Sequence, residues 1–449
     1  MKNKVYDIFL GFATIVLLAI PFSSVVFAQD NIVWTLDDCL DHALKNNYTV
    51  QQFIWQREKA GINYRMARNN YLPEVQGRVR DMNNWGLFVD PATNQLTNRN
   101  TEIYTASVEG EVQLFNGGYN YYNAKERQAL FDASGSDLEI INNEISLLII
   151  SAYYRVLFSQ EQVKISELQL EQAKKQYELV RGLVANGVLH KRDQLQMESE
   201  VAQREVVVTN ANNNLLRSRL LLRQTMGFTV DENVEVSPEQ MPGIPDSLSL
   251  KSFEDLCKNA SVILPDISSA EARLNAANFR YKAARAMLYP TLSLSAGVIT
   301  RSSSLLQIEQ RTQFRQNLSQ FIAFNLYVPV FTRFDRINNT NLSRIDVRIQ
   351  ENQVKKTNLE IEQRVQSAYL DLVAAHKTFK AVTKKLESLD SEYNYAVKSY
   401  NLGIINVTEY NYISNMFRNA QQEKLQAEYD YYVKKKILDF YEGKAICKR

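Results

Sequence analysis

The most regular pattern of hydrophobic and polar positions in the chain lies between residues 103 and 115. Small or apolar residues alternate there one by one with polar residues, two of which are the carboxylates Glu109 and Glu111. The side chains of a β-strand point alternately to its two faces, so this alternation predicts a strand with one apolar and one polar face. Such a strand suits either a half-buried hairpin of a soluble protein or the wall of a membrane barrel around a water-filled lumen.

Three further segments also predict strands, and the four together cover about residues 74–88, 102–115, 291–304 and 314–331. Strands of about 9–11 residues suffice to cross the hydrocarbon core of a membrane. In lipid, each unpaired group at the edge of an open sheet costs several kcal/mol, and about eight strands are needed to close even a filled barrel. A membrane location therefore requires several copies of the chain, and the sequence alone does not choose between a dimer with 8 strands and a trimer with 12.

In a closed barrel, we expect the apolar faces of these strands to meet lipid and the polar faces to line the lumen. Glu109 and Glu111 are then predicted to face the lumen. The residues predicted to face lipid are Tyr104, Val108, Val112, Leu114, Ile322, Phe324 and Leu326.

The chain contains an internal duplication. "YRMARNNYLP" (64–73) matches "YKAARAMLYP" (281–290), and "SAYYRVL" (151–157) matches "SAYLDLV" (367–373) at nearly the same offset. Recurrence at a fixed offset indicates a repeated structural unit. It predicts a first repeat over 29–227, a linker over 228–252 that holds three prolines, and a second repeat over 253–449.

Long helices are predicted in both repeats, because proline is absent from 119–237 and 330–449 and hydrophobic residues recur there in steps of three and four. That period of 3.5 is typical of helices that coil around a neighbour. The predicted elements are long helices at about 119–184 and 335–401, return helices at about 189–226 and 405–442, and shorter helices at about 36–70 and 253–287. At 1.5 Å per residue a long helix reaches about 100 Å, so a shorter helix and a return helix are expected to lie end to end beside it.

The segment 1–28 has the features of a secretory signal peptide, with two lysines, an apolar run and a small residue, Ala28, at the expected cleavage position. After this leader no apolar stretch approaches the length of about 18 residues that a membrane-spanning helix needs, which excludes a protein built from such helices. The net charge of +2 argues against nucleic acid as a partner.

The sequence holds no pattern typical of catalysis or metal binding. His42, His190 and His376 lie far apart, and "NGGYN" lacks the spacing of a phosphate-binding loop. We therefore expect no enzyme, no cofactor and no metal site. A disulfide between Cys39 and Cys257 can form in an oxidising compartment, and free buried thiols are the alternative.

Several motifs, in an order that occurs twice, resemble the TolC-like outer membrane efflux proteins over nearly all of residues 34–443. They are "TLDDCLDHALKNN", "VQLFNGG", "VPVFTRF", "GVLHKRDQL" and "GIINVTEYN". The resemblance implies a mainly α fold in which a trimer forms a 12-stranded outer membrane barrel on a long periplasmic α-helical tunnel. It implies a passive exit duct for tripartite efflux or type I secretion, in the outer membrane of a Gram-negative bacterium.

The resemblance also implies partners and site residues. The partners are a periplasmic membrane-fusion adaptor, an inner-membrane pump driven by protons or ATP, and the lipid of the outer membrane. Asp193, Tyr400 and Glu409 match positions at which the family closes the periplasmic tip. The turns implied to contact the adaptor hold Gly187, Val188, Leu189, Gly403, Ile404 and Ile405.

This chain departs from the family pattern at the gate. Ile405 stands where a basic latch partner is common, and the second acid expected near Tyr412 is missing. Asp193 and Glu409 can instead simply begin the return helices, where carboxylates are favoured. Another function class also stays open, a secreted or periplasmic coiled-coil structural protein that is not a channel, and the sequence does not name the cargo of a channel.

Overall fold

The computed structural model describes residues 33–90, 93–228, 234–237, 241 and 243–444. The first half of the chain contains α1 (Leu36–Asn46), α2 (Tyr48–Asn69), β2 (Glu74–Asn84), β5 (Thr101–Phe115), α3 (Tyr119–Ala185) and α4 (Lys191–Met226). The second half contains α5 (Phe253–Ile263), α6 (Pro265–Ala286), β7 (Thr291–Ser303), α7 (Gln310–Gln316), β8 (Ser319–Tyr327), α8 (Asp335–Asn401) and α9 (Val407–Tyr441). Short two-residue strands are β1 (Val33–Trp34), β3 (Phe88–Val89), β4 (Leu96–Thr97) and β6 (Glu235–Val236). The proposed signal peptide, residues 1–28, lies outside the described residues.

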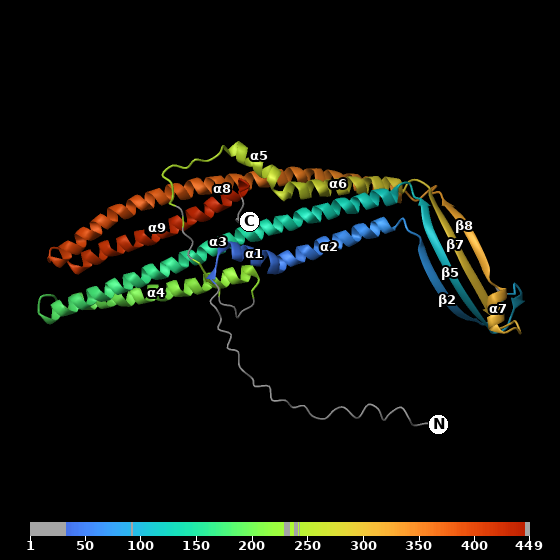
Figure 1. Cartoon of the computed structure of the whole chain (residues 1–449), viewed down its shortest axis with the longest axis horizontal. Coiled ribbons are helices and arrows are strands. Elements are labelled where there is room, and N and C mark those ends of the chain that lie inside the picture. Colours follow the sequence, from blue (N-terminus) through green and yellow to red (C-terminus); the bar gives the residue numbers. More distant parts are fainter. Residues whose placement is uncertain (1–32, 91–92, 229–233, 238–240, 242, 445–449) are drawn as a thin grey trace, which may run out of the picture.

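The molecule is a long rod with the sheet at one end and the turns between long and return helices at the other (Figure 1). α3 and α8 each have 67 residues, which corresponds to about 100 Å. α2 and α4 follow each other along α3, α9 lies beside α8, and α6 packs against both α3 and α8. The end-to-end arrangement expected from the helix lengths is therefore observed. Among the described helices, none is long and apolar enough to cross a membrane.

The single helices expected over 36–70 and 253–287 are each divided in two. In the first, Asn47 is extended, and its Oδ1 accepts hydrogen bonds from the backbone N–H of Thr49 and Val50, which starts α2 as a new helix. In the second, Pro265 starts α6, and the residue before it is extended because the proline ring disfavours the helical conformation there. The expectation of unbroken helices was wrong for this local reason.

The four main strands form one antiparallel sheet in the order β2-β5-β7-β8. The strand predicted over 314–331 is shorter than expected and covers Ser319–Tyr327, because residues 310–316 form α7 instead. Gln313, which is buried, anchors α7: its Nε2 donates to the carbonyls of Ser303 and Ile308, and its Oε1 accepts from the N–H of Ser303. Pro329 has no N–H to continue the ladder beyond Tyr327. The strand predicted over 74–88 likewise ends earlier, at Asn84.

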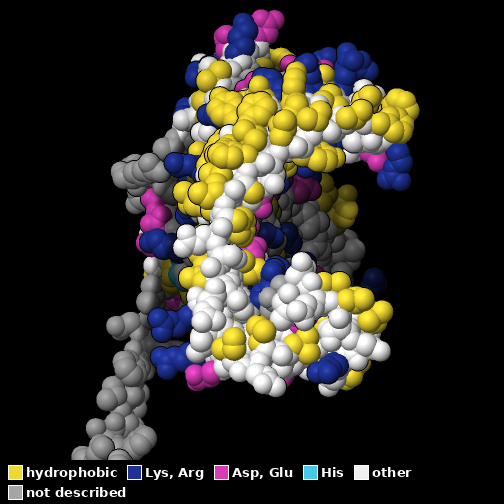
Figure 2. Space-filling model, turned by 90° about the vertical axis from the view of Figure 1, so that its right-hand side faces the viewer, with side chains coloured by type: hydrophobic (Ala, Val, Ile, Leu, Met, Phe, Trp, Pro, Cys, Tyr) yellow, Lys and Arg dark blue, Asp and Glu magenta, His cyan; other side chains and the backbone are white. Residues whose placement is uncertain are grey.

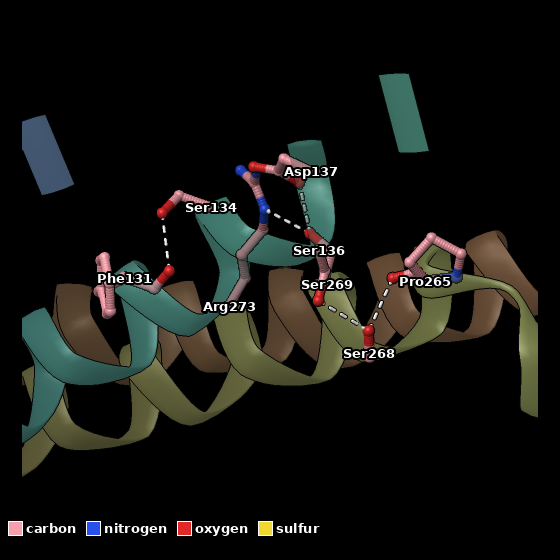
Figure 3. A network of polar contacts seen from close by, with 8 residues as sticks. All are labelled: Phe131, Ser134, Ser136, Asp137, Pro265, Ser268, Ser269 and Arg273. Carbon is pink, nitrogen blue, oxygen red and sulfur yellow. Dashed lines mark hydrogen bonds and ion pairs between the residues drawn. The ribbon is translucent and has the colours of Figure 1, made fainter. Parts of the chain in front are cut away.

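The helices of the two repeats are joined by polar contacts between α3 and α6 (Figure 3). Arg273 Nη2 lies 2.5 Å from Asp137 Oδ2, and Ser269 Oγ donates to Asp137 Oδ1 at 2.6 Å. Next to them, the hydroxyls of Ser136 and Ser268 are 2.8 Å apart. Because small serine side chains leave room for close approach, this pair of helices is held by hydrogen bonds as well as by apolar packing.

The main hydrophobic core lies near the middle of the rod, where α1 and α5 meet the long helices. Its fully buried side chains include Leu40, Ile149, Tyr153, Leu256 and Leu372. Ile149 and Leu372 belong to the 3.5-residue pattern that the sequence shows. Cys39 lies in this core and Cys257 packs against it; both thiols are free. Burial raises the pKa of Cys39 to about 12, so the thiol stays protonated.

Candidate functional site

The strand register separates the sheet into an apolar and a polar face. Directly opposite neighbours share a face, and two rows across the sheet are Gly110–Ala296–Ile322 and Val112–Leu294–Phe324. The large exposed hydrophobic residues that the register places on this face are Val75, Val79, Val108, Val298, Ile322, Phe324 and Leu326. Figure 2 looks at the end of the molecule that carries the sheet, and hydrophobic side chains gather there in a broad band.

The residues predicted to face lipid lie on this apolar face, with one exception. Leu114 has no partner in the register, because a β-bulge lies between Gln113 and Phe115. Tyr104 is distinct from the rest, because its row contains Asp81 and Ser302 instead of apolar residues. Its hydroxyl donates to Glu102 at 2.5 Å. Tyr104 therefore marks the end of the apolar zone on the side of the sheet remote from the long helices.

Glu109 and Glu111 share the opposite, polar face and are both exposed. Glu111 lies directly opposite Glu74, and Glu109 lies opposite Gln76. The sheet thus has one face suited to hydrocarbon and one suited to water. Within the described strands, β2 and β8 each pair along one edge only, so the four strands do not close on themselves.

At the other end of the rod, Gly187 and Gly403 end the two long helices with left-handed backbone, at φ 73° and φ 72°. The next residues, Val188 and Ile404, are 66% and 71% exposed. The residues after those, Leu189 and Ile405, pack against a small hydrophobic cluster that joins the two helical hairpins. Its buried members are Val180, Met197, Tyr400, Val407 and Tyr410.

The three gate candidates, Asp193, Tyr400 and Glu409, do not cluster at one place in this chain. Asp193 and Glu409 occupy equivalent positions in the two repeats, and each is the third residue of its return helix. Asp193 Oδ2 accepts a hydrogen bond from the backbone N–H of His190 at 3.2 Å, which is the arrangement of a helix start. The N–H of Glu409 donates to the side chain of Asn406, and its carboxylate is exposed.

Tyr400 belongs to the cluster between the hairpins, where its ring stacks on Tyr410 with 4.9 Å between the centroids. Burial raises the pKa of Tyr400, and the carboxylate of Asp193 contributes to this in the same direction. The structure therefore brings Asp193 and Tyr400 into one neighbourhood. Ile405, where a basic partner is common in the family, packs against the same cluster.

Sequence reasoning missed a buried ionic cluster that joins α4 to α9. Glu200 Oε1 accepts from Arg204 Nε at 2.8 Å and from Arg418 Nη1 at 2.5 Å. Arg204 Nη2 also donates to Asn415 Oδ1 at 2.5 Å. The spacing of four between Glu200 and Arg204 was a usable signal for a helical ion pair. The contribution of Arg418, which lies in the other repeat, could not be seen in a local pattern.

The part of the chain that the structure describes contains no group of three or more His, Cys, Asp or Glu side chains placed to hold a metal ion. The candidate site consists of two surfaces, the two-faced sheet and the helical tip, at opposite ends of the rod.

Comparisons with known proteins agree with this geometry. The family model for outer membrane efflux proteins matches residues 39–228 and 257–443. The probable outer membrane lipoprotein SilC of Salmonella typhimurium is 24% identical over 364 residues, which is 78% of this chain and 71% of SilC. The cation efflux system protein CusC of Escherichia coli K12 is 25% identical over 366 residues, again 78% of this chain and 71% of CusC.

Solved structures show the same fold. A crystal structure of CusC has a TM-score of 0.78 at 17% identity and covers 91% of this chain and 92% of that chain. The CmeC outer membrane channel of Campylobacter jejuni has a TM-score of 0.77 at 16% identity, over 92% of this chain and 87% of that chain. The rod with a helical tunnel part and a sheet at one end is thus the architecture of solved outer membrane channels.

Proposed function

This chain belongs to the outer membrane efflux protein family, and on that premise we propose that it is the passive exit duct of a tripartite efflux or type I secretion system. The duct would receive cargo from an inner-membrane pump, driven by protons or ATP, through a periplasmic adaptor. The proposal needs no catalytic step and no cofactor in this chain.

The observation that carries the proposal is the two-faced sheet with open edges. An apolar face of this size is costly in water, and open edges are costly in lipid. Both costs disappear if β8 of one copy pairs with β2 of the next and the apolar face meets hydrocarbon. Three copies would supply 12 strands, which is enough to enclose a lumen lined by Glu109 and Glu111. A homotrimer is therefore the assembly that we propose.

The helical end is proposed as the periplasmic tip that opens and closes. Val188 and Ile404 are large exposed hydrophobic residues at the outermost turns, where they suit contacts with an adaptor protein. The proposed adaptor-contact turns are Gly187, Val188, Leu189, Gly403, Ile404 and Ile405. Asp193, Tyr400 and Glu409 are proposed to shape the constriction, and the ion pairs of Glu200 add a connection between the hairpins that the family pattern did not predict.

Membrane fractionation and native mass spectrometry test this function. We expect the full-length chain to sediment with outer membranes, to require detergent for release and to have the mass of three chains in detergent. A matched variant that places a charge on the apolar face, Phe324→Lys, should assemble less, since a cationic side chain at the middle of the membrane costs about 2–4 kcal/mol. A wild-type chain that stays soluble and monomeric after lysis would contradict the proposal.

A further inference from the structure

The polar face of the sheet is divided by charge along the strands. Its acidic residues, Glu74, Glu109 and Glu111, all lie in the half next to the long helices. Its basic residues are Arg78, Arg80 and Arg301, and all lie further from the helices than the acidic residues do. The four strands contribute no other charged side chain to this face. We call these two groups the acidic zone and the basic zone.

The strand register fixes the order of the two zones. Glu111 lies opposite Glu74, and Glu109 lies one row further along the strands. In the basic zone, Arg80 and Arg301 lie on either side of Thr105 in one row. The outermost rows, at Glu111 and Thr105, are six residues or about 20 Å apart at 3.4 Å per residue, whereas the nearest acidic and basic residues, Glu109 and Arg78, are only two residues or about 7 Å apart along the strands.

Neither zone is neutralised within the described chain. None of the six charged side chains forms an ion pair with another described residue, and the closest polar contact is the hydrogen bond from Gln76 to Glu74 at 2.7 Å. Like charges directly opposite each other destabilise a sheet, so the pair Glu74–Glu111 is unfavourable for folding alone. A basic or neutral residue at either of these two positions would have avoided this cost.

We infer that the barrel carries two charged belts in series, so that ion flow through it rectifies and the outer, arginine-lined belt binds anions. The inference rests on the proposed function, because the belts exist only if the polar faces of several copies line one lumen. In a trimer they would contain nine carboxylates and nine guanidinium groups. Guanidinium groups favour phosphate and carboxylate oxygens, with which they form paired hydrogen bonds.

The two zones adjoin at Glu109 and Arg78, while their outermost rows lie further apart than the screening length at physiological salt. The screening length is about 8 Å at 0.15 M ionic strength and about 3 Å at 1 M, against about 7 Å between the nearest rows of the two zones and about 20 Å between their outermost rows. A pore lined by acidic groups favours cations, and one lined by arginines favours anions. With an acidic and a basic zone in series, a voltage of one sign drives cations and anions into the lumen from opposite ends. A voltage of the other sign drives both kinds of ion out of the lumen, so the current is smaller.

Single-channel recording of the full-length protein in a planar bilayer tests the inference. At 0.1 M KCl we expect unequal currents at equal and opposite voltages, and nearly equal currents at 1 M KCl, where the screening length falls to about 3 Å. Pyrophosphate added on the outer side should block the current. In the variant with Arg78→Gln, Arg80→Gln and Arg301→Gln, we expect rectification to disappear and block to weaken about tenfold, since a charged cleft concentrates counter-ions by about that factor or more.

Two further variants make the result specific. Replacing the same three arginines by lysine keeps the charge and should keep the rectification, which covers the case in which the glutamine variant fails to fold. Replacing the exposed Lys59 and Arg65 of α2 by glutamine removes charge away from the sheet and should change nothing. Symmetric wild-type currents at 0.1 M KCl, or equal block in wild type and the glutamine variant, would overturn the inference. No conductance at all from the wild type would instead contradict the proposed channel function.

Discussion

Glu200 on α4 and Arg418 on α9 form an ion pair of 2.5 Å, and both side chains are almost withdrawn from solvent. Arg204 shares the same carboxylate oxygen, so two cations depend on one anion. This contact ties the first helical hairpin to the second a few turns above the tip. The family resemblance implies a basic latch residue at the position of Ile405, which is apolar here. The ion pair of Glu200 and Arg418 instead supplies a charged connection between the two hairpins.

Removing this carboxylate should destabilise the helical end strongly. In Glu200→Gln, two buried guanidinium groups lose their counter-charge, and breaking a buried pair in this way costs about 3–5 kcal/mol. The thermal unfolding midpoint of the detergent-solubilised protein should fall, and protease cleavage near the tip should speed up. The control is Glu178→Gln, which removes an exposed partner of Arg181. Equal midpoints for the two variants would show that the buried cluster does not hold the hairpins together.

In the turn that joins a strand to a long helix, we expect substitutions to change stability in opposite directions in the two repeats. Gly117 and Arg333 occupy equivalent positions in the two repeats, and both have left-handed backbone, at φ 67° and φ 50°. A non-glycine residue in this conformation costs about 1–2 kcal/mol, so Arg333→Gly should raise the free energy of unfolding by about 1 kcal/mol. Gly117→Ala should lower it, because the new Cβ would lie 2.4 Å from the carbonyl oxygen of Ala286. Urea unfolding of the two variants measures both signs, and a loss of stability in Arg333→Gly would refute the reasoning.

The start of α1 should be sensitive to acid. The carboxylate of Asp38 accepts hydrogen bonds from the side chain and backbone of Thr35, and these bonds lower the pKa of Asp38. Because the pKa in the folded state lies below the unfolded value, the stabilisation is present above about pH 4 and is lost as the pH falls through the folded pKa. Wild type should be more stable than Asp38→Asn at pH 7, by about 1 kcal/mol for the weakened hydrogen bonds of the capping box. The difference in unfolding midpoint should shrink towards pH 3, and a difference that grows in acid would be inconsistent with this cause.

The exposed carboxylate of Glu409 should affect ion selectivity. Three copies around an axis would form a ring of negative charge at the tip, and acidic rings favour cations. In Glu409→Gln we expect a smaller reversal potential in a KCl gradient and a smaller preference for potassium over chloride. Asp193→Asn serves as the comparison, since that carboxylate is engaged at the start of α4. Unchanged selectivity in Glu409→Gln would remove this residue from the constriction.

The periodic patterns of the sequence predicted the two faces of the sheet and the long helices. The alternation around Val112 and around Phe324 indicated the two faces of the sheet, and the register places these two residues in one row. The 3.5-residue pattern with no proline indicated the long helices, and α8 covers Asp335–Asn401 where a helix over 335–401 was expected.

The features that escaped prediction depend on contacts between distant residues or on single capping groups. The helix α7 is held by Gln313, whose partners are Ser303, the last residue of β7, and Ile308 in the loop after it, and no periodic pattern reveals that anchor. The break at Asn47 depends on one side chain that caps α2 and also donates to the carbonyl of Thr225 at the end of α4. The ion pair between Glu200 and Arg418 joins residues of different repeats. The roles of Asp193, Tyr400 and Glu409 stay predictions that rest on the family resemblance.

The central claim is that the apolar face of the sheet meets hydrocarbon while the opposite face meets water. Its most direct measurement is electron paramagnetic resonance of spin labels placed at two successive residues of β8 in lipid vesicles, in a chain whose native cysteines are replaced by serine. With Ile322→Cys we expect a label that collides with dissolved oxygen and is protected from a water-soluble nickel chelate. With Ala323→Cys, whose side chain points to the other face, we expect the reverse. Equal exposure of both labels to the nickel chelate would contradict the account.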